Sequence, residues 1–130
     1  KRIAVQTTSK PEKVLMEHRD DNRIPKLGDI YSVSGMDEVY ASMRKGYVDA
    51  IAGHESAMLS FMKSNPGVYR MLEESLYVSE LGVAFEKGTH EAFAKELTQV
   101  LNQMKKDGTI RTIVEKYGLD ADKAVGEDAS

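Results

Sequence analysis

A histidine stands where an α/β protein would place a ligand-binding residue. Residues 48–52 lie between Gly46 and Gly53 and predict a buried strand, and His54 follows Gly53. In open α/β sheets, ligands bind just past the carboxyl end of a strand, where the next helix begins. His54 is therefore a candidate ligand contact. The alternative is a cap or loop histidine whose side chain is satisfied by backbone groups.

A second stretch of polar residues follows the first apolar run of the chain, residues 3–5. Ser9 and Glu12 have the spacing of a capping box, and Pro11 lies in the first turn, where proline is tolerated. The pattern predicts a helix that begins here and continues to about His18. A plain cap accounts for Ser9 and Glu12, although a cap can coexist with an anion site.

Several kinds of chemistry lack their residues in this sequence. The chain has no cysteine, which excludes disulfides, thiolate metal sites and a cysteine nucleophile. Its three histidines are scattered at His18, His54 and His90 without the spacing of a metalloprotease helix. Neither a glycine-rich phosphate loop nor a G-x-S-x-G elbow is present. We therefore expect no metal, no cofactor and no catalysis.

Composition narrows the class of protein further. The chain has 130 residues, of which 41% are hydrophobic and 30% charged, as in an ordinary soluble globular domain. A net charge of −3 argues against nucleic acid as a partner, because nucleic-acid binding needs a basic face. No apolar run approaches the roughly 20 residues of a membrane span. The chain begins without Met or a signal peptide, so we expect a processed or excised piece of a longer protein.

Hydrophobic periodicity gives an alternating order of elements. Strands are predicted at 3–5, at about 29–34 and at 48–52, each followed by a helix; residues 71–78 are extended, and 82–87 form a last strand. The longest helix covers about 91–106, and Thr109 is expected to cap a short final one. Residues 19–29 read as a polar loop and 119–130 as a polar, mostly loose tail. This order predicts an α/β fold with a mainly parallel sheet covered on both faces, a three-layer αβα arrangement.

Three stretches in the correct order resemble one family. "GYVDAIAGHES", "RIAVQTTSKPE" and "LGVAFEKGTHEAFAKELTQVLNQMKKDGTIRTIVEKYG" are similar to segments of the extracytoplasmic solute-binding proteins that serve polar-amino-acid ABC importers. The resemblance covers residues 1 to about 118. It implies one lobe of a periplasmic-binding-protein-like (type II) fold, with residues 1–78 as most of the second lobe. Residues 79–118 would be the strand and two helices that return to the first lobe, most of which is absent.

The resemblance also implies a ligand site. In similar family members, a Gly-Thr-Thr turn after the first strand holds the α-carboxylate of the ligand at a helix N-terminus. The matching positions are Thr8, Ser9 and Lys10, so threonine replaces the glycine and lysine the second threonine. The family's aspartate for the α-ammonium group falls on His54. Since Lys10 and His54 can both carry positive charge, we expect an anionic ligand, although Lys10 could instead be merely solvated.

The sequence favours a binding module outside the cytoplasm, without chemistry of its own. Its partners would be a small polar or anionic ligand and, in the intact protein, an ABC permease or a receptor. Two alternatives stay open: the sensing domain of a membrane kinase or cyclase, and a dehydratase on the same fold that uses Lys10 and His54 as acid–base groups.

The second lobe lacks the strand that would precede residue 1, which leaves one strand position vacant. Residues 82–87 are apolar and strand-like, so we expect them to fill that vacancy within the chain or, in a strand-swapped homodimer, by exchange with a second copy. The helix over 91–106 would then bury its apolar face against the same sheet.

Overall fold

The computed structural model describes residues 1–19 and 27–126 and divides the chain into two compact units, Lys1–Ser79 and Glu80–Ser130. The described residues of the first unit form three strands and three helices. The elements in chain order are β1 (Ile3–Gln6), α1 (Lys10–His18), β2 (Ile30–Val33), α2 (Met36–Arg44), β3 (Ala50–Ala52) and α3 (Glu55–Lys63). Most of the polar loop predicted for 19–29 and the end of the predicted tail lie outside the described residues.

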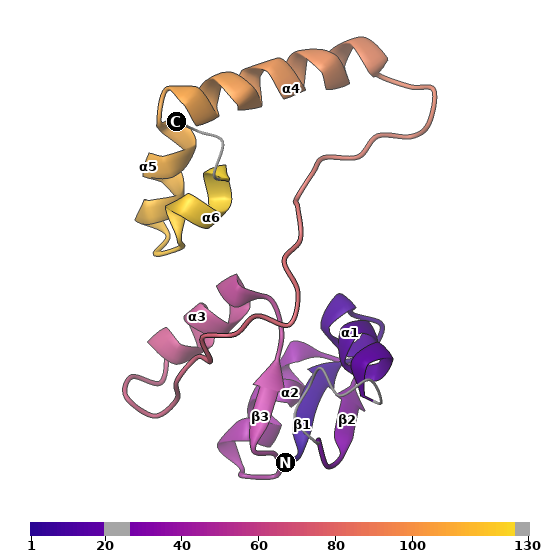
Figure 1. Ribbon diagram of the computed structural model, residues 1–130, viewed down its shortest axis with the longest axis vertical. Coiled ribbons are helices and arrows are strands. Elements are labelled where there is room, and N and C mark those ends of the chain that lie inside the picture. Colours follow the sequence, from indigo (N-terminus) through magenta and orange to yellow (C-terminus); the bar gives the residue numbers. More distant parts are fainter. Residues whose placement is uncertain (20–26, 127–130) are drawn as a thin grey trace. The chain divides into compact units, whose positions relative to one another are not determined.

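The sheet is parallel, in the order β2-β1-β3, so β1 is its central strand (Figure 1). Ile3 pairs with Ile30 on one side and with Ala50 on the other. The predicted α/β class with a parallel sheet is therefore confirmed. The strand expected over 48–52 is shorter than predicted, since Val48 precedes the paired segment as a buried residue.

Each face of the sheet is covered by one helix. Because side chains alternate along a strand, Ile3 and Val5 point to one face, where they pack against Leu15 of α1. Ala4 points to the other face and packs against Val39 of α2. Ala4, Val5, Leu15 and Val39 are completely buried, which makes these two contacts the centre of the core. The resulting layers are helix, sheet and helix, as predicted.

The segment after α3 is held by a stack of three aromatic rings. Phe61 of α3 is buried between Tyr40 of α2, at 4.5 Å between ring centroids, and Tyr69, at 5.0 Å. The Tyr40 hydroxyl donates to the carbonyl oxygen of Ala57 at 3.2 Å. Burial, with the charge of Asp37 as a smaller cause, raises the pKa of Tyr40, so the phenol stays protonated and keeps this bond. The stack joins α2, α3 and residue 69.

The described residues of the second unit, 80–126, form three helices, α4 (Glu91–Lys106), α5 (Thr109–Lys116) and α6 (Ala121–Val125). The limits of α4 agree with the prediction. The predicted cap of α5 is wrong, because Thr109 is the first helical residue and not the cap. The carboxylate of Asp107 accepts hydrogen bonds from the backbone N–H and the hydroxyl of Thr109, at 2.9 and 2.6 Å.

The prediction of a loose tail is wrong for α6. Asp120 caps this helix by accepting hydrogen bonds from the backbone N–H groups of Asp122 and Lys123, at 3.0 and 3.2 Å. Asp122 in turn binds Arg111 of α5 at 2.7 Å. The cap and this ion pair order a segment whose polar composition suggested a tail.

The strand predicted over 82–87 is also wrong, because none of these residues belongs to a strand, and neither do residues 71–78. The apolar composition of 82–87 indicated a need for burial, and a strand forms only where a neighbouring strand satisfies its backbone groups. Without that strand, nothing in the described residues supports the strand-swapped homodimer. Burial of the α4 face against the sheet stays a prediction.

The start of β3 is fixed by an aspartate, which gives a prediction for acid stability. Asp49 accepts a hydrogen bond from the backbone N–H of Arg2 at 2.8 Å and pairs with the Arg2 guanidinium at 3.4 Å. The backbone bond first, and the guanidinium second, lower the pKa of Asp49 in the folded state. A lowered pKa stabilises the fold above the ordinary value of about 4 and withdraws that contribution as pH falls through the folded value.

Asp49→Asn should therefore lower the urea midpoint at neutral pH and flatten its fall between about pH 5 and pH 2. Urea unfolding at a series of pH values measures this, with Asp29→Asn as the control on an exposed aspartate before β2. An equally steep acid loss in Asp49→Asn and the unaltered chain would contradict the assignment.

Candidate functional site

The candidate residues gather at the edge of the sheet where all three strands end, here called the carboxyl edge. Thr8, Ser9 and Lys10 follow β1, and His54 follows β3, its direct neighbour. After β1 the chain continues into α1, on one face of the sheet; after β3 it continues into α3, which stacks on α2 of the other face. Neighbouring parallel strands whose helices lie on opposite sides form a topological switch point, the usual ligand site of α/β sheets.

The turn after β1 is tightly bonded within itself. The Ser9 hydroxyl donates to the carbonyl oxygen of Gln6 at 2.6 Å and accepts from the backbone N–H of Glu12 at 3.4 Å. The Glu12 carboxylate reaches back to the backbone N–H of Thr8 at 2.7 Å. The predicted cap is therefore present, with Glu12 bonded one residue further back than in the usual capping box. Glu12 occupies a backbone donor that an anionic ligand could also use.

Thr8 has a strained backbone. Its φ is +56°, in the left-handed region that favours glycine and is unusual for a β-branched residue. This is the position at which the resemblance implies a glycine. The turn thus keeps the conformation of a glycine while carrying a threonine side chain, whose hydroxyl donates to the carbonyl oxygen of Thr7 at 2.7 Å.

Lys10 is the first residue of α1 and contacts an aromatic ring rather than a carboxylate. Its Nζ lies 4.6 Å from the centroid of the Tyr77 ring, and no carboxylate lies within ion-pair distance of it in residues 1–19 and 27–126. Sequence reasoning missed Tyr77. No local pattern marks it, because its contact with Lys10 joins two distant parts of the chain.

His54 occupies the N-cap position of α3 with an extended backbone, φ −66° and ψ 141°. Its carbonyl oxygen accepts the first helical bond, from the N–H of Met58 at 3.0 Å. The imidazole makes no cap hydrogen bond and is exposed. His54 is thus a cap by its backbone, while its side chain does not bond the helix backbone as the capping alternative requires.

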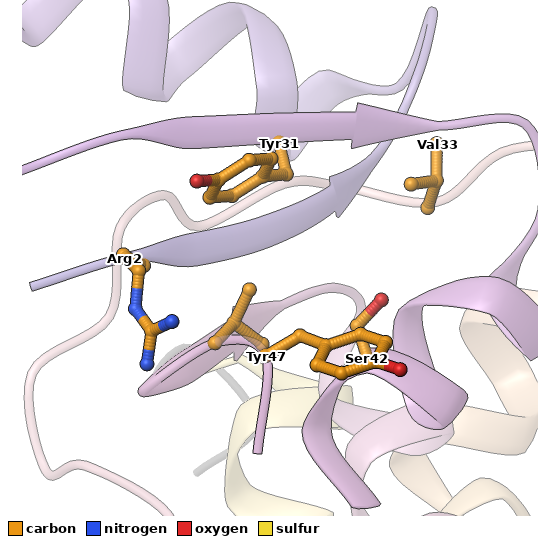
Figure 2. Close-up of a pocket in the computed structure, with 6 residues that line it drawn as sticks. Arg2, Tyr31, Val33, Ser42 and Tyr47 are labelled. Carbon is orange, nitrogen blue, oxygen red and sulfur yellow. The ribbon is translucent and has the colours of Figure 1, made fainter. Parts of the chain in front are cut away.

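None of the candidate residues lines the hollow drawn in Figure 2. It has a volume of about 370 Å³ and is lined by Arg2, Tyr31, Val33, Ser42, Tyr47 and Val48. The Arg2 guanidinium in its wall is already paired with Asp49. In the part of the chain that the structure describes, no cluster of three histidine or acidic side chains could hold a metal ion, and no helix is long and apolar enough to cross a membrane.

Comparison with known proteins finds similarity to binding proteins of ABC transporters. The chain is 33% identical over 85 residues to the L-cystine-binding protein TcyJ of Escherichia coli K12, an alignment that covers 65% of this chain and 32% of that protein. It is 25% identical over 122 residues to putative ABC transporter arginine-binding protein 2 of the same strain, covering 90% of this chain and 47% of that protein.

The chain thus spans less than half the length of these curated relatives. No family model and no solved structure matches it. The two similarities support the resemblance to solute-binding proteins, and the relatives are named as binding proteins rather than enzymes.

The strain at Thr8 can be measured. Thr8→Gly should raise the free energy of unfolding by about 0.5–1 kcal/mol, because the relief of an unfavourable φ exceeds the entropy that glycine adds to the unfolded chain. Thr7→Gly is the matched control and should lower it by about 0.5–1 kcal/mol, since Thr7 is not among the described residues with positive φ. Chemical denaturation measures both. Equal destabilisation by the two substitutions would contradict the strain.

Proposed function

We propose that this chain is the ligand-binding second lobe, with the C-terminal segment, of an extracytoplasmic solute-binding protein, and that it holds a small anionic solute at the carboxyl edge. The observation that carries the proposal is that Thr8, Ser9, Lys10 and His54 directly follow two neighbouring strands at a switch point. The similarity to the cystine- and arginine-binding proteins supports solute binding as the class of function.

The charge of the site supports an anionic solute. Lys10 supplies an ammonium group without a carboxylate partner in the described residues, and the His54 imidazole is exposed on the neighbouring loop. The Glu12 carboxylate is engaged with the backbone N–H of Thr8. A carboxylate or phosphate could accept charge-assisted hydrogen bonds from both side chains, each worth about 1.5–3 kcal/mol.

The intact protein would close its first lobe over the ligand. We expect the exposed apolar side chains of Ile113 in α5 and of Tyr117, directly after α5, to be covered by that lobe. Hinge closure on the solute would then present a surface that an ABC permease or a receptor recognises. The relatives are named for the binding of L-cystine and arginine, whereas this chain would bind a more acidic compound of similar size.

A thermal-shift panel tests the proposal, with L-cystine, L-arginine, L-glutamate, succinate and O-phospho-L-serine as probes. At equal concentrations, succinate and O-phospho-L-serine should stabilise the chain more than the other probes do. A probe at 100 times its Kd should raise the free energy of unfolding by about 2.7 kcal/mol. Lys10→Met and His54→Ala should each weaken binding about 10-fold or more, because each removes a charge-assisted hydrogen bond.

Two substitutions serve as controls. Lys13→Met alters a lysine of the same helix that is paired with Glu17 at 3.6 Å, and His90→Ala alters another N-cap histidine without a side-chain cap bond. Both should bind as the unaltered chain does. Stabilisation by L-cystine or L-arginine alone, unchanged in Lys10→Met and His54→Ala, would overturn the anionic assignment.

A further inference from the structure

We propose that Tyr77 is a positioning residue of the binding site, which holds the Lys10 ammonium at the carboxyl edge while leaving its charge available to an anion. The proposal rests on the proposed function for the existence of the anion. The contact between the Lys10 ammonium and the Tyr77 ring, 4.6 Å from the centroid, carries it.

A ring positions a cation differently from a carboxylate. Arg2, Lys13 and Arg111 are each paired with a carboxylate, at 3.4, 3.6 and 2.7 Å, so some of their N–H donors are already engaged. The face of an aromatic ring attracts an ammonium group through its quadrupole but carries no net charge. Lys10 therefore keeps a full positive charge and N–H donors that can turn to a ligand.

Without the ring, little would keep Lys10 at this place. Its four-carbon stem is flexible, and its ammonium group is exposed at the first position of a helix, where the positive end of the helix dipole repels a cation. The Tyr77 contact offsets part of the loss of side-chain freedom and of this repulsion. A cation that is ordered before the ligand arrives binds an anion at a smaller entropic cost.

The segment that carries Tyr77 has a fixed starting point in the core. Tyr69 stacks on Phe61, which is only 6% exposed and lies against Tyr40 on its other side. From that anchor, residues 70–76 run without helix or strand to Tyr77 beside α1. Tyr77 itself is 54% exposed, so it is not a core residue whose loss would unfold the unit.

The experiment combines binding with a direct view of the contact. Succinate and O-phospho-L-serine are titrated by calorimetry into the unaltered chain, Tyr77→Leu, Tyr77→Phe, Lys10→Met and the double variant of Tyr77→Leu with Lys10→Met. Tyr47→Leu is the matched control, because Tyr47 is also exposed and its ring centroid lies 5.8 Å from the Nζ atom of Lys45. Tyr47 lines the hollow of Figure 2 and not the carboxyl edge. NMR records the ring-current shift of the Lys10 ε-methylene protons.

Tyr77→Leu should weaken the binding of both probes about 2- to 5-fold and abolish the upfield shift of the Lys10 protons, without lowering the melting temperature. Tyr77→Phe should restore the affinity and the shift, and Tyr47→Leu should change neither. In the Lys10→Met background, Tyr77→Leu should have no further effect, because there is no cation left to position.

Each contrary result has a separate meaning. Normal affinity in Tyr77→Leu, or an absent ring-current shift in the unaltered chain, overturns the positioning role and leaves the proposed function standing. A loss of affinity that persists in the Lys10→Met background makes Tyr77 a direct ligand contact and also overturns positioning. If neither probe binds the unaltered chain, the proposed function fails, and the role of Tyr77 in it fails as well.

Discussion

The arrangement of the first unit depends on the central strand, β1, which is bonded on both sides and packed on both faces. Its backbone pairs in parallel with β2 and β3, and its side chains alternate between α1 and α2. A shift of one residue in its register would turn Ala4 toward α1, and Ile3 and Val5 toward α2. The core therefore allows one register only. That register brings the ends of all three strands to one edge.

The turn after β1 has a structural role and is also the place where we propose that the ligand binds. Ser9 and Glu12 satisfy the start of α1, and in doing so they hold Thr8 in a conformation that costs free energy. Strain of this kind persists only where the surroundings impose it, and it is concentrated at functional sites. The proposed anion would meet a turn whose shape is already set before binding.

The second unit is held together by contacts between neighbouring helices rather than by a large hydrophobic core. Ala121 and Val125 of α6 are buried, whereas α4 and α5 bury no residue completely. Both helices are amphipathic, and their apolar faces are half-exposed in this structure, which is expected of helices that complete a larger fold.

The sequence by itself determined the elements that rest on local signals. A short apolar run predicted β1 and weak alternation predicted β2. The Ser9–Glu12 spacing predicted the start of α1, and helical periodicity predicted the limits of α4. The same reasoning placed His54 at the end of a strand. These predictions succeed because capping and side-chain periodicity act between residues a few positions apart.

Only the tertiary structure decided features that depend on distant partners. Residues 82–87 have strand composition but form no strand, because pairing requires a neighbour that composition does not supply. The left-handed φ of Thr8 could be seen only in the folded turn. The ion pair between Asp122 of α6 and Arg111 of α5 likewise appears only in the structure. The contact of Lys10 with Tyr77 brings together two residues from opposite ends of the unit, and no local pattern carries that information.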